Sequence, residues 1–272
     1  MNMKLLLLTL LITTAVTADN YCEGIFFNNN YYNVEILKYG IRNLHQMVFN
    51  DNDNTLYFTF DQISIFPKRA LAYFNLDTKQ VGLVNGIRNA TGLAIDHKLN
   101  RVYVGGSDGL FFLNQNKVPE KLPVNDDIRY LFYKDVLYFI NSRREAYKFD
   151  FGVVNPLTEM YGLAVDKLIA DDDNNIFFLQ NTNLSRVKIG TRIINTHEKY
   201  KVNAIATDYN YKPYISSTTG VYVYNKYKYA LDKASDIIDL KEFVFNRKGE
   251  PIYVVVDHIV KLNYNPVPCF GD

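Results

Sequence analysis

Tryptophan is absent from the 272-residue sequence, and cysteine and histidine are scarce, with two and four copies. Any flat aromatic surface must therefore come from the 22 tyrosines and 18 phenylalanines. No two histidines lie at the spacing that a zinc site requires, so we expect no zinc centre. An excess of charge is also missing, since 30 Lys and Arg oppose 29 Asp and Glu. Because nucleic acids are held by clustered cations, this balance predicts no nucleic-acid partner.

A hydrophobic run long enough for a membrane span is missing as well. Only residues 5–12 form an apolar stretch, and they are too few, because a span needs about 18 or more such residues. This stretch follows Lys4 and precedes the small residues Val16-Thr17-Ala18, which suit a cleavage site. The pattern predicts a secretory signal peptide over residues 1–18, with an uncleaved anchor as the alternative. We therefore expect a secreted, extracellular chain that contacts no membrane.

The chain contains no linker rich in Gly, Ser or Pro, which predicts a single domain over residues 19–272. Hydrophobic residues make up 48% of the sequence and charged residues 22%, so a sizeable core can be buried. The abundant Tyr and Phe, together with Val, Ile and Thr, favour half-buried β-strands. Helical patterns are scarce. The composition therefore predicts an all-β fold.

One strand pattern recurs six times, each time after a polar turn. Its members share an aromatic residue near the middle of the strand: Tyr57, Tyr103, Tyr138, Phe177, Tyr214 and Tyr253. The first and last lie 196 residues apart, so the five intervals average about 39 residues. A period near 40 with several strands per unit is typical of a propeller blade. The sequence predicts a six-bladed β-propeller, and a sandwich of two packed sheets is the alternative.

Each unit contains further strands around the aromatic one. A small apolar strand precedes it, as in Leu93–Asp96 and Leu163–Asp166, and an alternating strand follows it, as in Ala146–Asp150. Alternation with a period of two indicates a strand with one buried face. The polar turns include the acidic run Asp171–Asn175, which we interpret as a hairpin turn and not as a calcium loop. His97 lies in a similar turn and is interpreted as a solvated turn residue.

The sixth unit lacks its last strand, because only a Pro-rich tail follows Asn263. The segment Tyr31–Leu37 alternates like an outer strand, and we expect it to complete the last blade. Cys22 and Cys269 lie at opposite ends of the mature chain. In an oxidising compartment we expect them to form one disulfide that closes the ring, with two free or intermolecular thiols as the alternative. Two triplets beginning at Asn89 and Asn183 are candidate glycosylation sites.

Motifs for catalysis are absent. The sequence contains no Gly-x-Ser-x-Gly elbow, and both cysteines serve the expected disulfide better than a nucleophile. We therefore expect a binding protein without catalytic residues, cofactor or metal.

Arginine recurs where the chain passes from one unit to the next, in Ile41-Arg42-Asn43, in Ile87-Arg88-Asn89 and in Ile128-Arg129. In a propeller these connections gather at one mouth of the central tunnel. Guanidinium groups bind carboxylates and sulfates and also stack on planar rings. The pattern predicts a ligand pocket at this mouth, formed by Arg42, His45, Arg88, Arg129, Arg144 and Tyr161. The alternative is that these arginines form structural salt bridges.

The signal peptide, the aromatic repeat, Gly40–Leu44 and the terminal Pro266-Val267-Pro268-Cys269 together resemble the ommochrome-binding proteins of lepidopteran haemolymph. The resemblance covers the mature chain. It implies a soluble pigment carrier, a monomer of the haemolymph, with an ommochrome as its bound ligand. Ommochromes are planar, anionic phenoxazinones derived from tryptophan, and aromatic walls with guanidinium groups suit such a molecule.

Two other classes of function stay open at this point. One is a propeller enzyme, either a calcium-dependent lactonase-like hydrolase or a relative of the insect yellow proteins acting on catechol derivatives. The other is a propeller that binds a protein partner through an exposed hydrophobic patch.

Overall fold

The computed structural model describes residues 24–63 and 68–268, which fold into 24 β-strands and one short 3-10 helix, η1 (Thr158–Met160). The predicted all-β class is therefore confirmed. The predicted signal peptide, Cys22 and Cys269 lie outside the described residues.

Every pair of neighbouring strands in the sheets is antiparallel, as short turns between consecutive strands require. Three sheets have four strands each. The first contains β3 (Leu44–Asn50), β4 (Thr55–Gln62), β5 (Lys68–Asn75) and β6 (Val81–Val84). The second contains β7 (Gly92–Asp96), β8 (Arg101–Gly106), β9 (Gly109–Leu113) and β10 (Pro119–Lys121). The third contains β11 (Ile128–Lys134), β12 (Val136–Asn141), β13 (Ala146–Asp150) and β14 (Val153–Pro156).

The remaining strands form a seven-stranded sheet and a five-stranded sheet. The larger contains β15 (Lys167–Ala170), β16 (Asn175–Gln180), β17 (Asn183–Lys188), β18 (Ile194–Thr207), β19 (Pro213–Ser217), β20 (Gly220–Asn225) and β21 (Ala230–Ser235). The smaller has the order β1 (Gly24–Phe27), β2 (Asn30–Lys38), β24 (His258–Tyr264), β23 (Pro251–Val255) and β22 (Glu242–Phe245).

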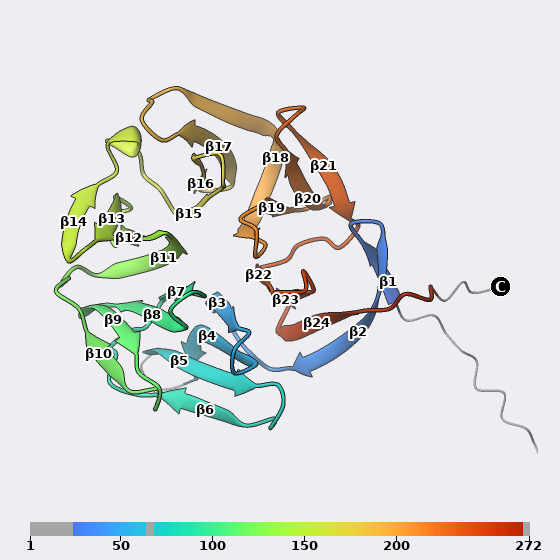
Figure 1. Ribbon diagram of the computed structural model, residues 1–272, viewed down its shortest axis with the longest axis horizontal. Helices are drawn as coiled ribbons and strands as arrows, with labels where there is room; N and C mark the ends of the chain where they lie inside the picture. The colour runs from blue at the N-terminus through green and yellow to red at the C-terminus, as the bar shows by residue number, and fades with distance from the viewer. Residues whose placement is uncertain (1–23, 64–67, 269–272) are drawn as a thin grey trace, which may run out of the picture.

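The sheets stand side by side around a central axis (Figure 1). Their innermost strands contact one another in a closed circuit, β3 to β7, β7 to β11, β11 to β15, β15 to β18, β18 to β22, and β22 back to β3. Within each four-stranded sheet the chain then proceeds outward, strand by strand. We call these innermost strands the inner strands.

Strand β18 joins two of the predicted units in one sheet. Its first part, with Ile194 opposite Val187, pairs with β17, and its last part, Val202–Thr207, pairs with β19. It is thus both the outermost strand of one group and the inner strand of the next. Because β18 is shared, the hydrogen-bonded strands form five sheets, whereas the sequence predicts six repeated units.

The N-terminal strand completes the last sheet, as the alternation of Tyr31–Leu37 predicts. Strand β2 pairs with β24 in an antiparallel register that sets Val34 opposite Leu262. Strand β1 then caps β2 on the outside. The residue that follows β1 also reaches the neighbouring sheet, because the Asn28 backbone nitrogen donates to the Ala234 carbonyl oxygen over 2.8 Å. The first strands of the chain therefore close the circle of sheets.

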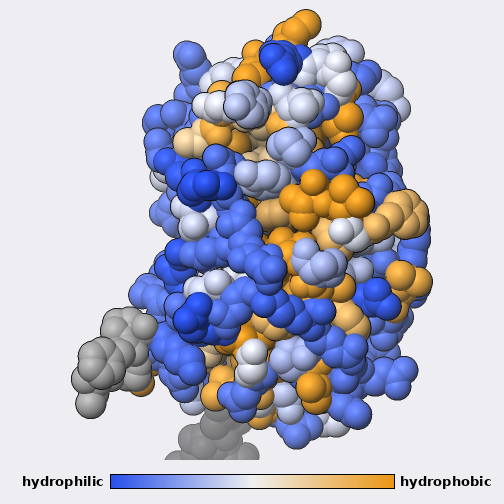
Figure 2. All heavy atoms as spheres, turned by 90° about the vertical axis from the view of Figure 1, so that its left-hand side faces the viewer, coloured by the Kyte–Doolittle hydropathy of each residue, from blue (hydrophilic) through white to orange (hydrophobic). Residues whose placement is uncertain are grey.

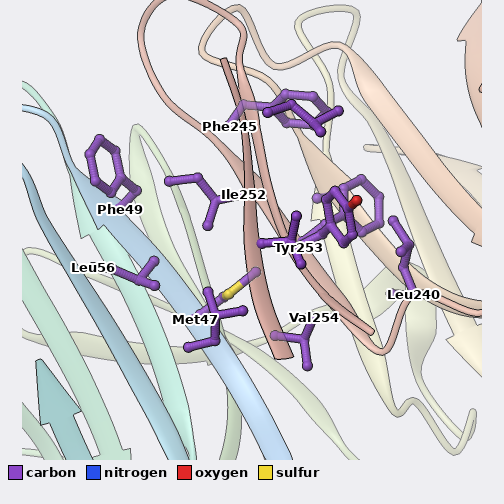
Figure 3. Packing of buried hydrophobic residues seen from close by; sticks show 14 of the residues in the cluster. Met47, Phe49, Leu56, Leu240, Phe245, Ile252, Tyr253 and Val254 are labelled. Atoms are coloured by element: carbon purple, nitrogen blue, oxygen red, sulfur yellow. The ribbon is translucent and has the colours of Figure 1, made fainter. Parts of the chain in front are cut away.

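The aromatic residues of the repeat pack in the spaces between sheets. All six predicted positions lie in the second strand of a unit, and each is at most 8% exposed. The largest cluster fills both sides of the five-stranded sheet, where Met47, Phe49 and Leu56 meet Ile252 and Val254 (Figure 3). Burying such side chains contributes about 1.5–3 kcal/mol each, so these seams hold the circle together.

One predicted strand is wrong. Leu163–Asp166 precedes the inner strand of its unit, which is β15, Lys167–Ala170. Asp166 instead anchors a bend, since its carboxylate accepts hydrogen bonds from the Asn181 backbone nitrogen (2.5 Å) and from Arg144 (2.7 Å). The segment Leu163–Asp166 therefore resembles the inner strand Leu93–Asp96 in sequence but does not form a strand.

Candidate functional site

Two hollows lie on the central axis, one at each face of the circle. We call the face at which the inner strands begin the N-face, and the face at which they turn into the second strands the C-face. The C-face hollow has a volume of about 100 Å³ and is lined by residues of every inner strand, including Phe49, Ile95, Tyr133, Ile205 and Phe245. The N-face hollow is wider and more open, and is lined by residues near the starts of β3, β17 and β22.

Polar side chains close the channel between the two hollows. The buried side chain of Gln46 donates to the Leu131 carbonyl oxygen (2.6 Å) and accepts from the Leu93 amide (2.9 Å), so it bridges two other inner strands. Lys167 and the buried carboxylate of Glu242 form an ion pair at 2.5 Å. Burial raises the pKa of Glu242, and Lys167 only partly opposes this effect. The channel is therefore blocked by a hydrogen-bonded layer.

The N-face hollow is lined by polar groups. His45 contacts Asp61 at 2.7 Å, Asn43 donates to the same carboxylate at 3.1 Å, and Arg69 lies 3.7 Å away. Burial acts to raise the pKa of Asp61, but the hydrogen bonds from His45 and Asn43 outweigh it and the pKa is lowered. The ionised Asp61 therefore holds the His45 ring beside the hollow, where Lys241 also lies.

The structure places the predicted arginines around this N-face, mostly in ion pairs. Arg88 contacts Asp108 at 2.7 Å and Arg129 contacts Asp127 at 2.8 Å. Arg144 contacts Asp166 at 2.7 Å and also donates to Asn181, a residue of the hollow, at 3.3 Å. Arg42 is exposed and has no ion pair among the described residues. Three of the guanidinium groups therefore have a structural partner.

Of the predicted residues, the structure brings His45 and Arg144 near the same hollow. His45 lines it, and Arg144 contacts Asn181, which also lines it. Tyr161 lies apart from it, directly after η1. Its side chain is 82% exposed and lines a separate groove with Arg143 and Leu163. The predicted set thus surrounds the N-face without forming one continuous pocket.

The C-face hollow contains the aromatic residues that sequence reasoning missed. Tyr209 contacts two groups: the His97 ring, whose centroid is 5.2 Å away, and the Arg247 guanidinium, 5.0 Å from the Tyr209 centroid. Tyr133 and Tyr211 line the same hollow, and Lys134 lies over the Tyr211 ring at 5.5 Å. Aromatic rings therefore line this mouth, and two of them have a cation over the ring.

His97 is not the solvated turn residue that the sequence predicts. It does follow an inner strand, but its side chain lines the hollow and packs on Tyr209. Burial lowers its pKa, and the carboxylate of Asp51 only partly opposes this effect. The sequence signal that could have located this site is the polar turn after each inner strand, which carries His97, Tyr209 and Arg247.

The two candidate glycosylation sites differ in exposure. Asn183 is exposed at the start of β17, whereas Asn89 is half-buried and donates to the Ser107 hydroxyl at 3.2 Å. Glycosylation of either remains a prediction. The acidic run is a hairpin turn, as predicted, because Asp171 accepts hydrogen bonds from the backbone nitrogens of Asp173 and Asn175 at 2.9 and 2.8 Å.

Over residues 24–63 and 68–268, no group of three or more His, Cys, Asp or Glu side chains is arranged to hold a metal ion. No helix within the same residues has the length and apolar character of a membrane span. The side of the molecule that carries β10 and β14 is mostly hydrophilic, with a patch of hydrophobic side chains (Figure 2). Phe151, Val153 and Val154 are exposed on the hairpin that ends in β14.

Solved structures similar to this chain are propeller-like. A gluconolactonase from Xanthomonas campestris has a TM-score of 0.66 at 10% identity, over 89% of this chain and 92% of that chain. Regucalcin, a calcium-binding protein from Agrobacterium tumefaciens, has a TM-score of 0.64 at 12% identity, over 86% and 94%. The WD40 β-propeller domain of Doa1 has a TM-score of 0.59 at 12% identity, over 85% and 97%. Such low identities show the fold alone, a propeller-like arrangement of antiparallel sheets.

No family model matches the chain. A relative does match along almost the whole sequence: the ommochrome-binding protein of Manduca sexta is 27% identical over 268 residues. These residues make up 96% of this chain and 98% of that protein. The predicted resemblance to the ommochrome-binding proteins is therefore confirmed over nearly the full length of the chain.

Proposed function

We propose that this protein is a secreted carrier that binds an ommochrome, a planar anionic phenoxazinone, without acting on it chemically. The similarity to the ommochrome-binding protein of Manduca sexta carries this proposal, because it covers 96% of this chain and leaves no large part of either protein unmatched. The hollows on the axis support it, since a pocket between rigid strands binds a ligand without ordering many groups first.

The scaffold in this proposal is a six-bladed propeller formed by one domain over residues 19–272. The seven-stranded sheet counts as two blades that share β18, because β18 pairs with β17 in its first part and with β19 in its last part. The circuit of inner-strand contacts from β3 through β22 supports the same count.

A disulfide between Cys22 and Cys269 would lock this ring, after removal of residues 1–18 as a signal peptide. The flanking segments support the pairing. Gly24 lies opposite Asn33 in β2, and the Asn265 backbone nitrogen donates to the Tyr31 carbonyl oxygen at 2.9 Å. Both ends of the described chain therefore meet the same stretch of β2. Oxidised protein should lose two mass units on bridge formation, relative to reduced protein, which mass spectrometry measures.

The pigment would lie at a mouth of the channel, with its rings on aromatic side chains and its carboxylates near cations. Each face has a mouth with cationic side chains near it. The N-face carries the set predicted from the sequence: Arg42, His45, Arg88, Arg129, Arg144 and Tyr161. The C-face carries the tyrosines around the 100 Å³ hollow. In either case one monomer in the haemolymph would hold the pigment, with no nucleic acid or membrane involved.

A titration of purified, colourless protein with an ommochrome tests the carrier function. We expect a shift of the visible absorption band and quenching of tyrosine fluorescence, because the ring would stack on tyrosines. Saturation at one pigment per chain would support a defined site. Unchanged spectra at all pigment concentrations would overturn the proposal.

The competing function is a propeller enzyme. Incubation with lactones and with catechol derivatives, each with and without calcium, distinguishes the two. The carrier proposal expects no turnover above that of heat-denatured protein. Calcium-dependent lactone hydrolysis, or conversion of a catechol derivative, would replace the carrier by an enzyme.

A further inference from the structure

The two faces of the channel differ in the chemistry they offer a flat ring. Among the residues that the structure describes, those around the N-face hollow are polar or aliphatic apart from one ring, His45. The C-face hollow is lined by Tyr133, Tyr209, Tyr211 and Phe245 together with His97. Aromatic rings stack on flat ligands and give about 0.5–1.5 kcal/mol per pair beyond the buried area. The C-face is therefore the better partner for a planar aromatic molecule.

Tyr209 is already held as a platform. The His97 ring packs on it with an angle of 52° between the planes, and the Arg247 guanidinium lies 5.0 Å from its centroid. The Arg247 backbone is fixed independently of its side chain, because its nitrogen donates to Asp51 at 2.7 Å. The Arg247 side chain is exposed at the mouth and can also meet a carboxylate.

The hollow is blind and smaller than a whole multi-ring pigment. Gln46 and Glu242, which lie at its deep end, belong to the hydrogen-bonded layer that blocks the channel. A volume of about 100 Å³ is below that of an engineered cavity of about 150 Å³ that binds benzene. A ligand can therefore insert the edge of one ring and leave the rest at the mouth, against Tyr209.

We propose that the C-face hollow is the pigment site, in which one ring edge enters between Tyr133 and Tyr211, the ring face stacks on Tyr209, and a carboxylate of the ligand pairs with Arg247. This inference rests on the proposed carrier function and assigns its ligand-binding residues. It places the ligand on the face opposite to the arginines predicted from the sequence. Asp208, whose pKa is raised by burial, lies beside the mouth and disfavours a second ligand carboxylate at that point.

Single variants at the two faces test the assignment by pigment titration. Tyr209→Ala and Arg247→Gln change exposed side chains and should each weaken binding about tenfold, as expected for the loss of a stacking or charge-assisted contact. Tyr227→Ala, at another exposed tyrosine, and Lys241→Gln, at the N-face hollow, are the matched controls. Both controls should bind like the wild type.

The pigment methyl ester adds a second readout. The wild type should bind the ester more weakly than the free acid, whereas Arg247→Gln should bind both equally. If the wild type binds the pigment and both C-face variants bind it equally well, this site assignment is overturned and the carrier function stands. If the wild type itself binds no pigment, the carrier function fails and the assignment fails with it. Far-UV circular dichroism and thermal unfolding verify that each variant is folded.

Discussion

At the scale of single residues, the channel contains an ion pair that is largely shielded from water. The Glu242 side chain is 4% exposed, and Lys167, its partner, is 19% exposed. A buried charge without its partner is costly, although the pair as a whole adds little compared with a well-packed apolar pair. The ion pair therefore matters most for what happens when one member is lost.

Glu242→Gln should lower the free energy of unfolding by about 3 kcal/mol, because it leaves the Lys167 ammonium in the channel without a counter-charge. Adding Lys167→Met should recover most of this loss. Urea denaturation measures both values. Lys226→Gln, which removes the exposed pair with Asp173 (3.1 Å), is the control and should leave stability unchanged. Equal stability of Glu242→Gln and the wild type would contradict the role given to this pair.

Two histidines should make the protein less stable in mild acid. Burial lowers the pKa of His97 and of His197 from the usual 6.5. Above pH 6.5 both the folded and the unfolded chain hold these rings neutral. As the pH falls below 6.5, the unfolded chain takes up protons first, so the free energy of unfolding decreases. Denaturation at pH 7.5, 6.0 and 5.0 should show this decrease in the wild type.

The His97→Gln, His197→Gln double variant should lose less stability over the same pH range. A pH dependence identical to that of the wild type would show that neither ring is kept neutral by burial.

The sequence identifies the type of residue in the site better than its place. The sequence correctly places His97 in a turn after an inner strand. The ring that packs on it, Tyr209, belongs to a unit far away in the sequence. No local pattern links the two. The arginine pattern at Arg88 and Arg129 is real, yet both side chains pair with aspartates: Arg88 with Asp108 in the turn between β8 and β9, and Arg129 with Asp127, two residues before it. Such pairing depends on loop geometry that spacing alone does not specify.

At the scale of elements, strand β1 acts as a latch across two sheets. Phe27 is 1% exposed and packs within 5.9 Å of both Tyr214 and Phe245, which belong to different sheets. On the sheet next to its own, Ser235 donates to the Phe26 carbonyl oxygen and Tyr214 accepts from the Asn28 side chain, both over 2.8 Å. The latch thus couples the N-terminus to the closing seam.

Phe27→Ala should therefore cost about 3–5 kcal/mol of stability, as is typical when a buried Phe is truncated. The neighbouring Phe26, which is 53% exposed on the same strand, provides the control, since Phe26→Ala should change stability little. Thermal unfolding of both variants measures the difference. Similar midpoints for the two would show that β1 does not secure the seam.

The hairpin between β8 and β9 requires glycine at position 109. Its φ is +120°, and a Cβ there would lie 2.0 Å from the Val124 carbonyl oxygen. Gly152 is the matched control, because its φ is also positive (+83°) but its Cβ would meet open space. Gly152→Ala should cost about 1–2 kcal/mol for the left-handed backbone, and Gly109→Ala clearly more. Equal losses in chemical denaturation would contradict the predicted clash.

Strand order was predictable because period-two alternation and polar turns are local signals. The strand Ala146–Asp150 and the closing segment Tyr31–Leu37 show this directly, since β13 and β2 contain them. The position of β15 was not predictable, because Leu163–Asp166 carries the same apolar pattern as a true inner strand. Pairing with β16 and the hydrogen bonds of Asp166 decide between the two, and the latter involve Asn181 and Arg144, which lie 15 and 22 residues away in the sequence.

At the scale of the whole molecule, the closed circuit of inner strands separates two faces with different chemistry. The N-face has ion pairs and amides around an open hollow, whereas the C-face has tyrosines around a blind one. The layer of Gln46, Glu242 and Lys167 keeps the two apart. A rigid ring of this kind can present a binding surface at one face without changing the other.

A crystal structure of the protein with bound ommochrome tests the central claim most directly. The account predicts a ring of six blades with the pigment at the C-face mouth, its ring face on Tyr209 and a carboxylate beside Arg247. A pigment bound at the outer rim or at the N-face arginines, or a crystal grown with excess pigment that contains none, would contradict it.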